Sequence, residues 1–62
     1  MKILIVDDEA LARERLGGLL TELDPAIALT HAENGLQALE SIKKQPPDIV
    51  LLDIRMPVMG GL

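Results

Sequence analysis

Two runs of four consecutive apolar residues, at positions 3–6 and 49–52, each end directly at a carboxylate. A continuous apolar run of this length, rich in β-branched residues, is typical of a strand buried on both faces of a parallel sheet. Asp7 and Asp8 follow the first run, and Asp53 follows the second. The chain is therefore expected to place acids at the ends of its most hydrophobic strands.

Helical patterns separate these runs. The first helix is predicted after Asp7, Asp8 and Glu9, which would cap it, and Asp24-Pro25 would end it. Its apolar face would hold Ala12, Leu16, Leu19, Leu20 and Leu23, while Glu9 and Arg13 would form an i,i+4 pair. A second helix, capped by Asn34, would have one face lined by Leu36, Leu39 and Ile42, with Ala38 beside them.

A weaker strand pattern at residues 27–32 lies between the two helices, so the predicted order is βαβαβ. Right-handed crossovers then give an α/β fold, with a three-stranded parallel sheet and helices on both faces. The mixed second strand suits an edge and the first strand the centre, which predicts the order 2-1-3. The third strand is apolar enough to be central in a larger sheet, although this chain offers its outer edge no neighbour.

Composition excludes several classes of protein. The 62 residues are less than half of a typical domain, and they include no aromatic side chain and no cysteine, so disulfides and thiolate metal sites are excluded. The net charge of −4 argues against binding of nucleic acid or anionic membranes by this segment. The first apolar run is too short for a signal peptide, and no run could span a membrane. We therefore expect a cytoplasmic protein.

The acids at the strand ends suggest a metal site. Neighbouring parallel strands end at the same edge of a sheet, so Asp7, Asp8 and Asp53 should converge where open α/β sheets bind ligands. Clustered carboxylates repel one another, and Mg²⁺, which prefers oxygen ligands, would remove that repulsion. A carboxylate beside such a cation is also a plausible nucleophile towards a phosphoryl group, and Asp53 is the candidate.

The stretches "ILIVDDEALARERL", "AENGLQAL", "PPDIVLLDIRMP" and "GGL" resemble the receiver domain of bacterial two-component response regulators. Among these, the opening "VDDEALARERL" is most similar to receivers joined to LytTR-type DNA-binding domains. The resemblance covers residues 1–62 but only the first half of the family's domain, so it implies a truncated, flavodoxin-like half-domain. The later strands and the effector domain would be absent.

The resemblance also implies roles for individual residues. Asp53 would be the phosphoacceptor, Asp8 a direct Mg²⁺ ligand, and Asp7 a ligand directly or through water. The backbone carbonyl of Arg55 would be a third protein ligand, and a sensor histidine kinase would donate the phosphoryl group. The family's Thr or Ser after strand four and Lys after strand five have no counterpart here, and Gly60 stands where the family often has Asp.

Three functions of different classes remain open. The first is a phosphoacceptor signalling module, which is not an enzyme in its own right and would be impaired in phosphorylation as a 62-residue chain. The second is a structural fragment that self-associates, most simply as a homodimer through the open edge of the third strand, and transfers no phosphate. The third is a Mg²⁺-dependent phosphohydrolase, which is disfavoured because no second acid lies two residues after Asp53. Taken alone, Asp7-Asp8 could be a helix cap and Asp53 a turn residue.

Overall fold

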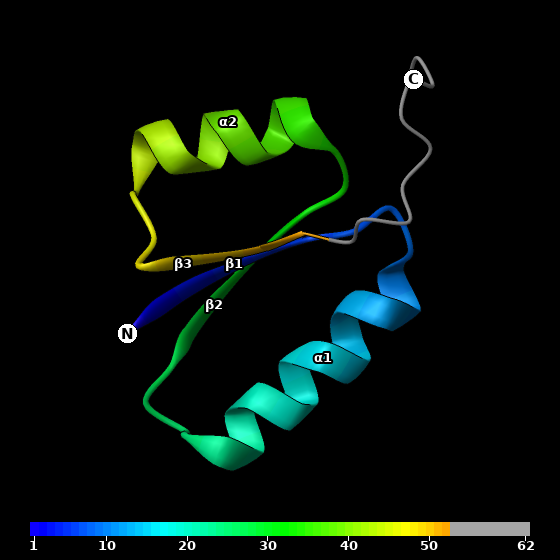
Figure 1. Ribbon diagram of the computed structural model, residues 1–62, viewed down its shortest axis with the longest axis vertical. Helices are drawn as coiled ribbons and strands as arrows, with labels where there is room; N and C mark the ends of the chain where they lie inside the picture. The colour runs from blue at the N-terminus through cyan, green and yellow to red at the C-terminus, as the bar shows by residue number, and fades with distance from the viewer. Residues whose placement is uncertain (53–62) are drawn as a thin grey trace.

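The computed structural model describes residues 1–52 and contains a three-stranded parallel sheet in the order β2-β1-β3. Its two helices, α1 and α2, cover opposite faces of the sheet (Figure 1). The elements are β1 Lys2–Val6, α1 Ala10–Leu23, β2 Ala28–Ala32, α2 Gly35–Lys44 and β3 Ile49–Leu52. The predicted α/β class, the βαβαβ order and the 2-1-3 sheet are confirmed. No helix in residues 1–52 is long and apolar enough to cross a membrane.

The central strand β1 forms the core of the sheet. Its residues 3–6 are each at most 4% exposed. Leu4 stands between Thr30 of β2 and Val50 of β3 in the strand register. Asp48 aligns the start of β3, because its N–H donates to the Lys2 carbonyl (2.8 Å) and its Oδ2 accepts from the Lys2 N–H (2.8 Å).

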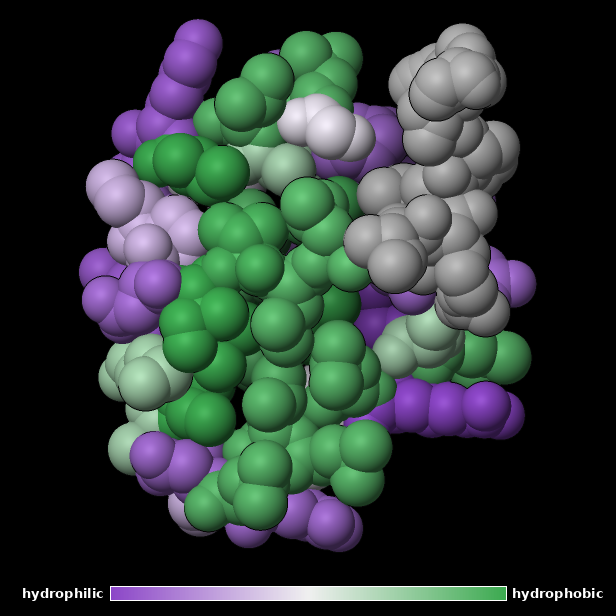
Figure 2. All heavy atoms as spheres, viewed as in Figure 1, coloured by the Kyte–Doolittle hydropathy of each residue, from purple (hydrophilic) through white to green (hydrophobic). Residues whose placement is uncertain are grey.

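Strand β3 is apolar but poorly covered. Ile49, Val50 and Leu52 are 40%, 39% and 60% exposed. Within residues 1–52 its outer edge has no paired strand. In Figure 2 hydrophobic side chains form a broad continuous surface across the face that the molecule presents in this view.

Helix α2 packs on the sheet through fewer large side chains than its apolar pattern predicts. Ala38 is buried in a cluster with Leu4, Val6 and Ala32, and Ile42 packs against this cluster. Leu36 and Leu39, which the sequence places on one face with Ile42, are by contrast 69% and 58% exposed. The helix turns its 38/42 side, rather than its 36/39 side, towards the strands.

The face of α1 was also only partly predicted. Ala12, Leu16 and Leu20 are half-buried as expected, whereas Leu19 and Leu23 are exposed. Gly17 is buried and faces Leu29 and His31 of β2. A Cβ built on Gly17 would lie 3.3 Å from Leu29 Cδ1 and 3.7 Å from His31 Cε1. The absence of a side chain therefore lets this helix pack close to the sheet.

The two helices begin differently. Asn34 caps α2 as predicted, accepting from the Gln37 N–H (2.9 Å), and Gln37 Oε1 accepts in turn from the Glu33 N–H (2.8 Å). This is close to the reciprocal capping arrangement found at many helix starts. At α1 the predicted acidic cap is wrong, because the N-cap Glu9 makes no side-chain cap and the Asp7 carboxylate bonds the N–H of Glu9 itself.

The adjacent glycines of α1 give a matched stability test. We expect Gly18→Ala to stabilise the fold by up to about 1 kcal/mol, because alanine favours helix and nothing lies within 4 Å of the added Cβ. Gly17→Ala should raise the free energy of unfolding by less than Gly18→Ala does, or lower it, because Leu29 must move to make room for the methyl group. Urea unfolding of both variants checks this, and an equal gain for the two would contradict the close packing of α1 on β2.

Candidate functional site

The candidate site lies at the edge of the sheet where β1 and β3 end. Val6 stands opposite Leu52 in the parallel register, so both strands end at the same side. Asp7 and Asp8 follow β1 directly at this edge. The other predicted site residues, Asp53 and Arg55, lie outside the described residues, so the structure brings together only the acid pair.

Asp7 is held by hydrogen bonds from three directions and is only 7% exposed. Its N–H donates to the carbonyl of Ala32 in β2 (3.1 Å). Its carboxylate Oδ1 accepts from the N–H of Glu9 (2.9 Å), and its backbone carbonyl accepts from Nη1 of Arg13. The turn between β1 and α1 is therefore anchored to β2 on one side and to α1 on the other.

Asp8 is in the opposite situation. It is exposed, and its carboxylate takes part in no hydrogen bond or ion pair with the rest of residues 1–52. An exposed carboxylate without a protein partner keeps its lone pairs available to a ligand. The pair thus combines one fixed acid with one available acid.

These two acids fit part of a site for a hard cation. Asp8 offers two carboxylate oxygens, and Asp7 Oδ2 is not used by the hydrogen bond that Oδ1 accepts. Oxygen donors of this kind are the ligands that Mg²⁺ prefers, and one or two protein carboxylates are usual for it. Residues 1–52 contain no group of three potential ligands, so a complete site requires donors from outside them.

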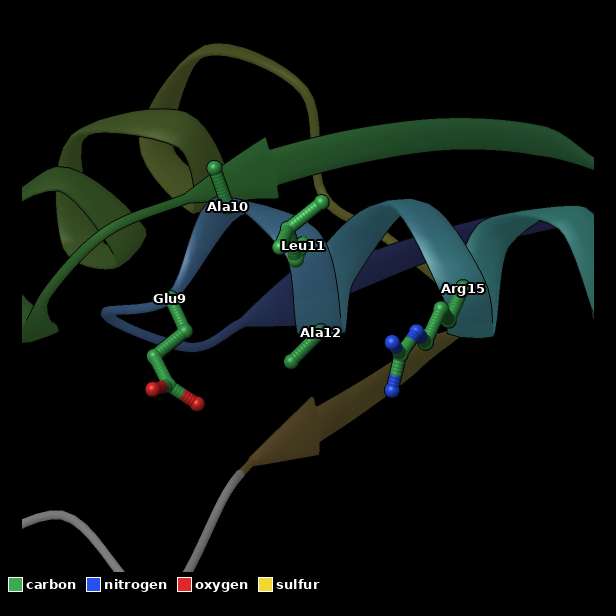
Figure 3. Close-up of a pocket in the computed structure, with 5 residues that line it drawn as sticks. All are labelled: Glu9, Ala10, Leu11, Ala12 and Arg15. Atoms are coloured by element: carbon green, nitrogen blue, oxygen red, sulfur yellow. The ribbon is translucent and has the colours of Figure 1, made fainter.

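A separate open hollow of about 550 Å³ lies beside the start of α1 and is lined by Glu9, Ala10, Leu11, Ala12 and Arg15. Figure 3 shows the side chains of Glu9, Ala12 and Arg15 on the side of α1 nearest the end of β3. Neither Asp7 nor Asp8 lines this hollow. It neighbours the acid pair and does not contain it.

Sequence reasoning missed the contact of Arg13. The predicted i,i+4 pair with Glu9 is wrong, because no ion pair within 4 Å joins them in the described part of the chain and the guanidinium bonds the Asp7 carbonyl instead. Glu9 is the N-cap and lies outside the helix, which changes the geometry that an i,i+4 pair requires. An arginine one turn into a helix that follows an acidic turn was the available signal.

Several known proteins are similar in sequence to this chain. The positive alginate biosynthesis regulatory protein of Pseudomonas aeruginosa is 57% identical over 63 residues, which cover all of this chain and 25% of that protein. An uncharacterized response regulatory protein of Vibrio cholerae is 50% identical over 95% of this chain and 23% of its own length. A protein-glutamate methylesterase/protein-glutamine glutaminase of Syntrophomonas wolfei is 43% identical over 98% of this chain and 17% of its own.

The chain thus spans a quarter or less of the length of these three relatives. No solved structure gives a significant match to it. Residues 3–62, nearly the whole sequence, match the family described as the response regulator receiver domain. With the confirmed 2-1-3 parallel sheet and the acid pair at the end of β1, this match shows that the chain belongs to the response regulator receiver domain family.

Proposed function

We propose that these residues form the first half of a phosphoacceptor receiver domain, in which Asp53 accepts a phosphoryl group from a sensor histidine kinase with Mg²⁺. The observation that carries the proposal is the shared end of β1 and β3, where a fixed Asp7 and an available Asp8 follow one strand and Asp53 follows the other in sequence. Family membership supports it.

In the proposed reaction a carboxylate oxygen of Asp53 attacks phosphorus, a P–O bond forms, and the P–N bond to the donor imidazole breaks. The imidazole nitrogen leaves and takes up a proton. Bound Mg²⁺ would neutralise charge that otherwise accumulates between the acids and the phosphoryl oxygens. Asp8, Asp7 and the backbone carbonyl of Arg55 would hold the cation, and the hydrogen bonds of Asp7 would keep its carboxylate in place.

The proposed setting is cytoplasmic, where the partner is the kinase that carries the phosphohistidine. The net charge of −4 supports a segment that does not itself contact nucleic acid. Relatives carry the names of both a biosynthesis regulatory protein and methylesterases. We propose a DNA-binding effector domain of the LytTR type, on the resemblance of the opening residues, and no enzymatic activity in residues 1–62.

A second function is favoured by the surface of β3. As a chain of 62 residues the protein would expose apolar β3 side chains and an unpaired strand edge. Such edges template pairing with another chain. The alternative is therefore a self-associating fragment that transfers no phosphate.

The metal part of the proposal is tested by titration with Mn²⁺ as a probe for Mg²⁺. We expect weak binding that Asp8→Ala reduces about tenfold or more, the scale on which metal sites respond to the loss of supporting groups. Glu9→Ala, which changes the next residue of the same acidic turn, should have a much smaller effect. Equal losses in the two variants, measured by calorimetry, would contradict a site built on Asp8.

A further inference from the structure

We propose that Arg13 is a positioning residue for the metal site: its guanidinium holds the backbone carbonyl of Asp7 and so fixes the direction in which Asp8 presents its carboxylate. The starting observation is the hydrogen bond from Arg13 Nη1 to the Asp7 carbonyl, which reaches back six residues from α1 to the acidic turn. The metal role of the turn rests on the proposed function.

The bond acts on Asp8 through the planarity of the peptide group. The carbonyl of Asp7 and the N–H of Asp8 belong to one rigid plane. An interaction that fixes the carbonyl oxygen therefore fixes the orientation of this plane, and the plane sets where the Asp8 side chain leaves the backbone. Asp8 has no side-chain partner within residues 1–52, so its backbone is what orients it.

The other anchors of the turn do not replace Arg13. The Asp7 N–H bond to Ala32 holds the peptide before Asp7, and the Oδ1 bond to Glu9 holds the carboxylate. Arg13 holds the peptide that follows Asp7. Arg13 is half-buried. Arg15, two residues further along α1, is exposed and forms no hydrogen bond with the acidic turn of residues 7–9.

A positioning role and a purely electrostatic role predict opposite signs. A positive charge near the acids repels a cation, so removal of the Arg13 charge alone would strengthen cation binding. Removal of a needed orienting bond would weaken it. The direction of the change in affinity therefore separates the two roles, and a merely structural role would leave affinity unchanged in the folded protein.

The experiment is a Mn²⁺ titration of the 62-residue chain and its Arg13→Met, Arg13→Lys and Arg15→Met variants, with circular dichroism on each sample. We expect Arg13→Met to weaken binding about tenfold, the scale of one lost hydrogen bond to a charged group. Arg13→Lys should restore part of the loss, because an ammonium donor can still bond the carbonyl. Arg15→Met, the matched loss of one charge from the same helix, should leave binding unchanged or slightly tighter.

A metal-free measurement keeps this inference separate from the proposed function. Amide hydrogen exchange at Glu9, whose N–H bonds Asp7, should become about tenfold faster in Arg13→Met when the turn loosens. The amide of Gln37, capped by Asn34 at the start of α2, should be unaffected.

Three outcomes overturn the inference. The first is Mn²⁺ binding by folded Arg13→Met that is as tight as in the wild type or tighter, and the second is amide exchange at Glu9 that this variant leaves unchanged. The third is a wild-type chain whose circular dichroism shows no helix and sheet signals. Wild-type protein that binds no Mn²⁺ would refute the proposed metal role. The Glu9 exchange rates would then still decide whether Arg13 orders the turn.

Discussion

A chain of these 62 residues is expected to elute as a dimer or a larger assembly, and not as a folded monomer, in size exclusion with light scattering at micromolar concentration. The reason is β3, whose Ile49, Val50 and Leu52 side chains are exposed and whose outer edge is unpaired within residues 1–52. Exposed leucines of both helices add apolar surface that self-association would cover. The folded state would then become more stable as concentration rises.

The register indicates how two copies would pair. The backbone groups of successive residues in a strand point to opposite sides. Asp7 directs its N–H at β2, so Val6 and Leu4, which lie one and three positions before it, direct their backbone groups at β3. Val50 and Leu52 stand opposite Leu4 and Val6 in the parallel register, so their N–H and carbonyl groups point to the outer edge of β3. If the two β3 strands ran parallel, a two-fold axis would place identical residues opposite each other, whereas parallel pairing needs a residue whose backbone groups face the partner opposite one whose groups face away. A closed dimer through this edge is therefore expected to be antiparallel.

Val50→Lys tests the edge directly. A lysine on an exposed strand edge opposes pairing with another chain, so this variant should lose the assembly. Thr30→Lys is the matched control, because Thr30 flanks Leu4 from β2 in the same register and is also exposed. A well-folded wild-type species of monomer mass would contradict the prediction, as would equal dissociation by the two variants.

The arrangement of the sheet could be predicted from the sequence because few physical alternatives exist. Runs of four apolar residues joined by helical crossovers permit mainly a parallel sheet, and the mixed strand belongs at an edge. Asp7 and Asp8 follow from that arrangement, since they come directly after the central strand. Asn34 was also predictable, because its capping bond to Gln37 is local in sequence.

Packing details were not predictable in the same way. Leu36 and Leu39 carry an apolar pattern, but the small Ala38 lets α2 lie with its 38/42 side on the strands. Likewise, the sequence alone does not show that Leu29 lies close to Gly17, because that contact joins α1 to a different element of the fold. Arg13 depended on the conformation of the turn, which places Glu9 before the helix and the Asp7 carbonyl within reach of the guanidinium.

The 62-residue chain, incubated with Mg²⁺ and acetyl phosphate, is expected to show little or no stable phosphorylation by intact mass. A phosphoryl group on Asp53 would add negative charge to the proposed acidic site, and the sequence contains no counterpart of the family's distal Lys to make a charge-assisted bond to it. A clear mass gain that Asp53→Asn abolishes would contradict this expectation.

The proposed role of Asp53 as the phosphoacceptor of a receiver domain, of which residues 1–62 would form the first half, can be tested by supplying the remainder of such a domain. A chimera would join residues 1–62 to the residues that follow the aligned region in the Pseudomonas aeruginosa relative, which is 57% identical over this region. With Mg²⁺ and acetyl phosphate, the chimera is expected to gain the mass of one phosphoryl group and its Asp53→Asn variant none. A folded chimera that gains no phosphoryl group, or gains it equally without Asp53, would rule out Asp53 as the acceptor.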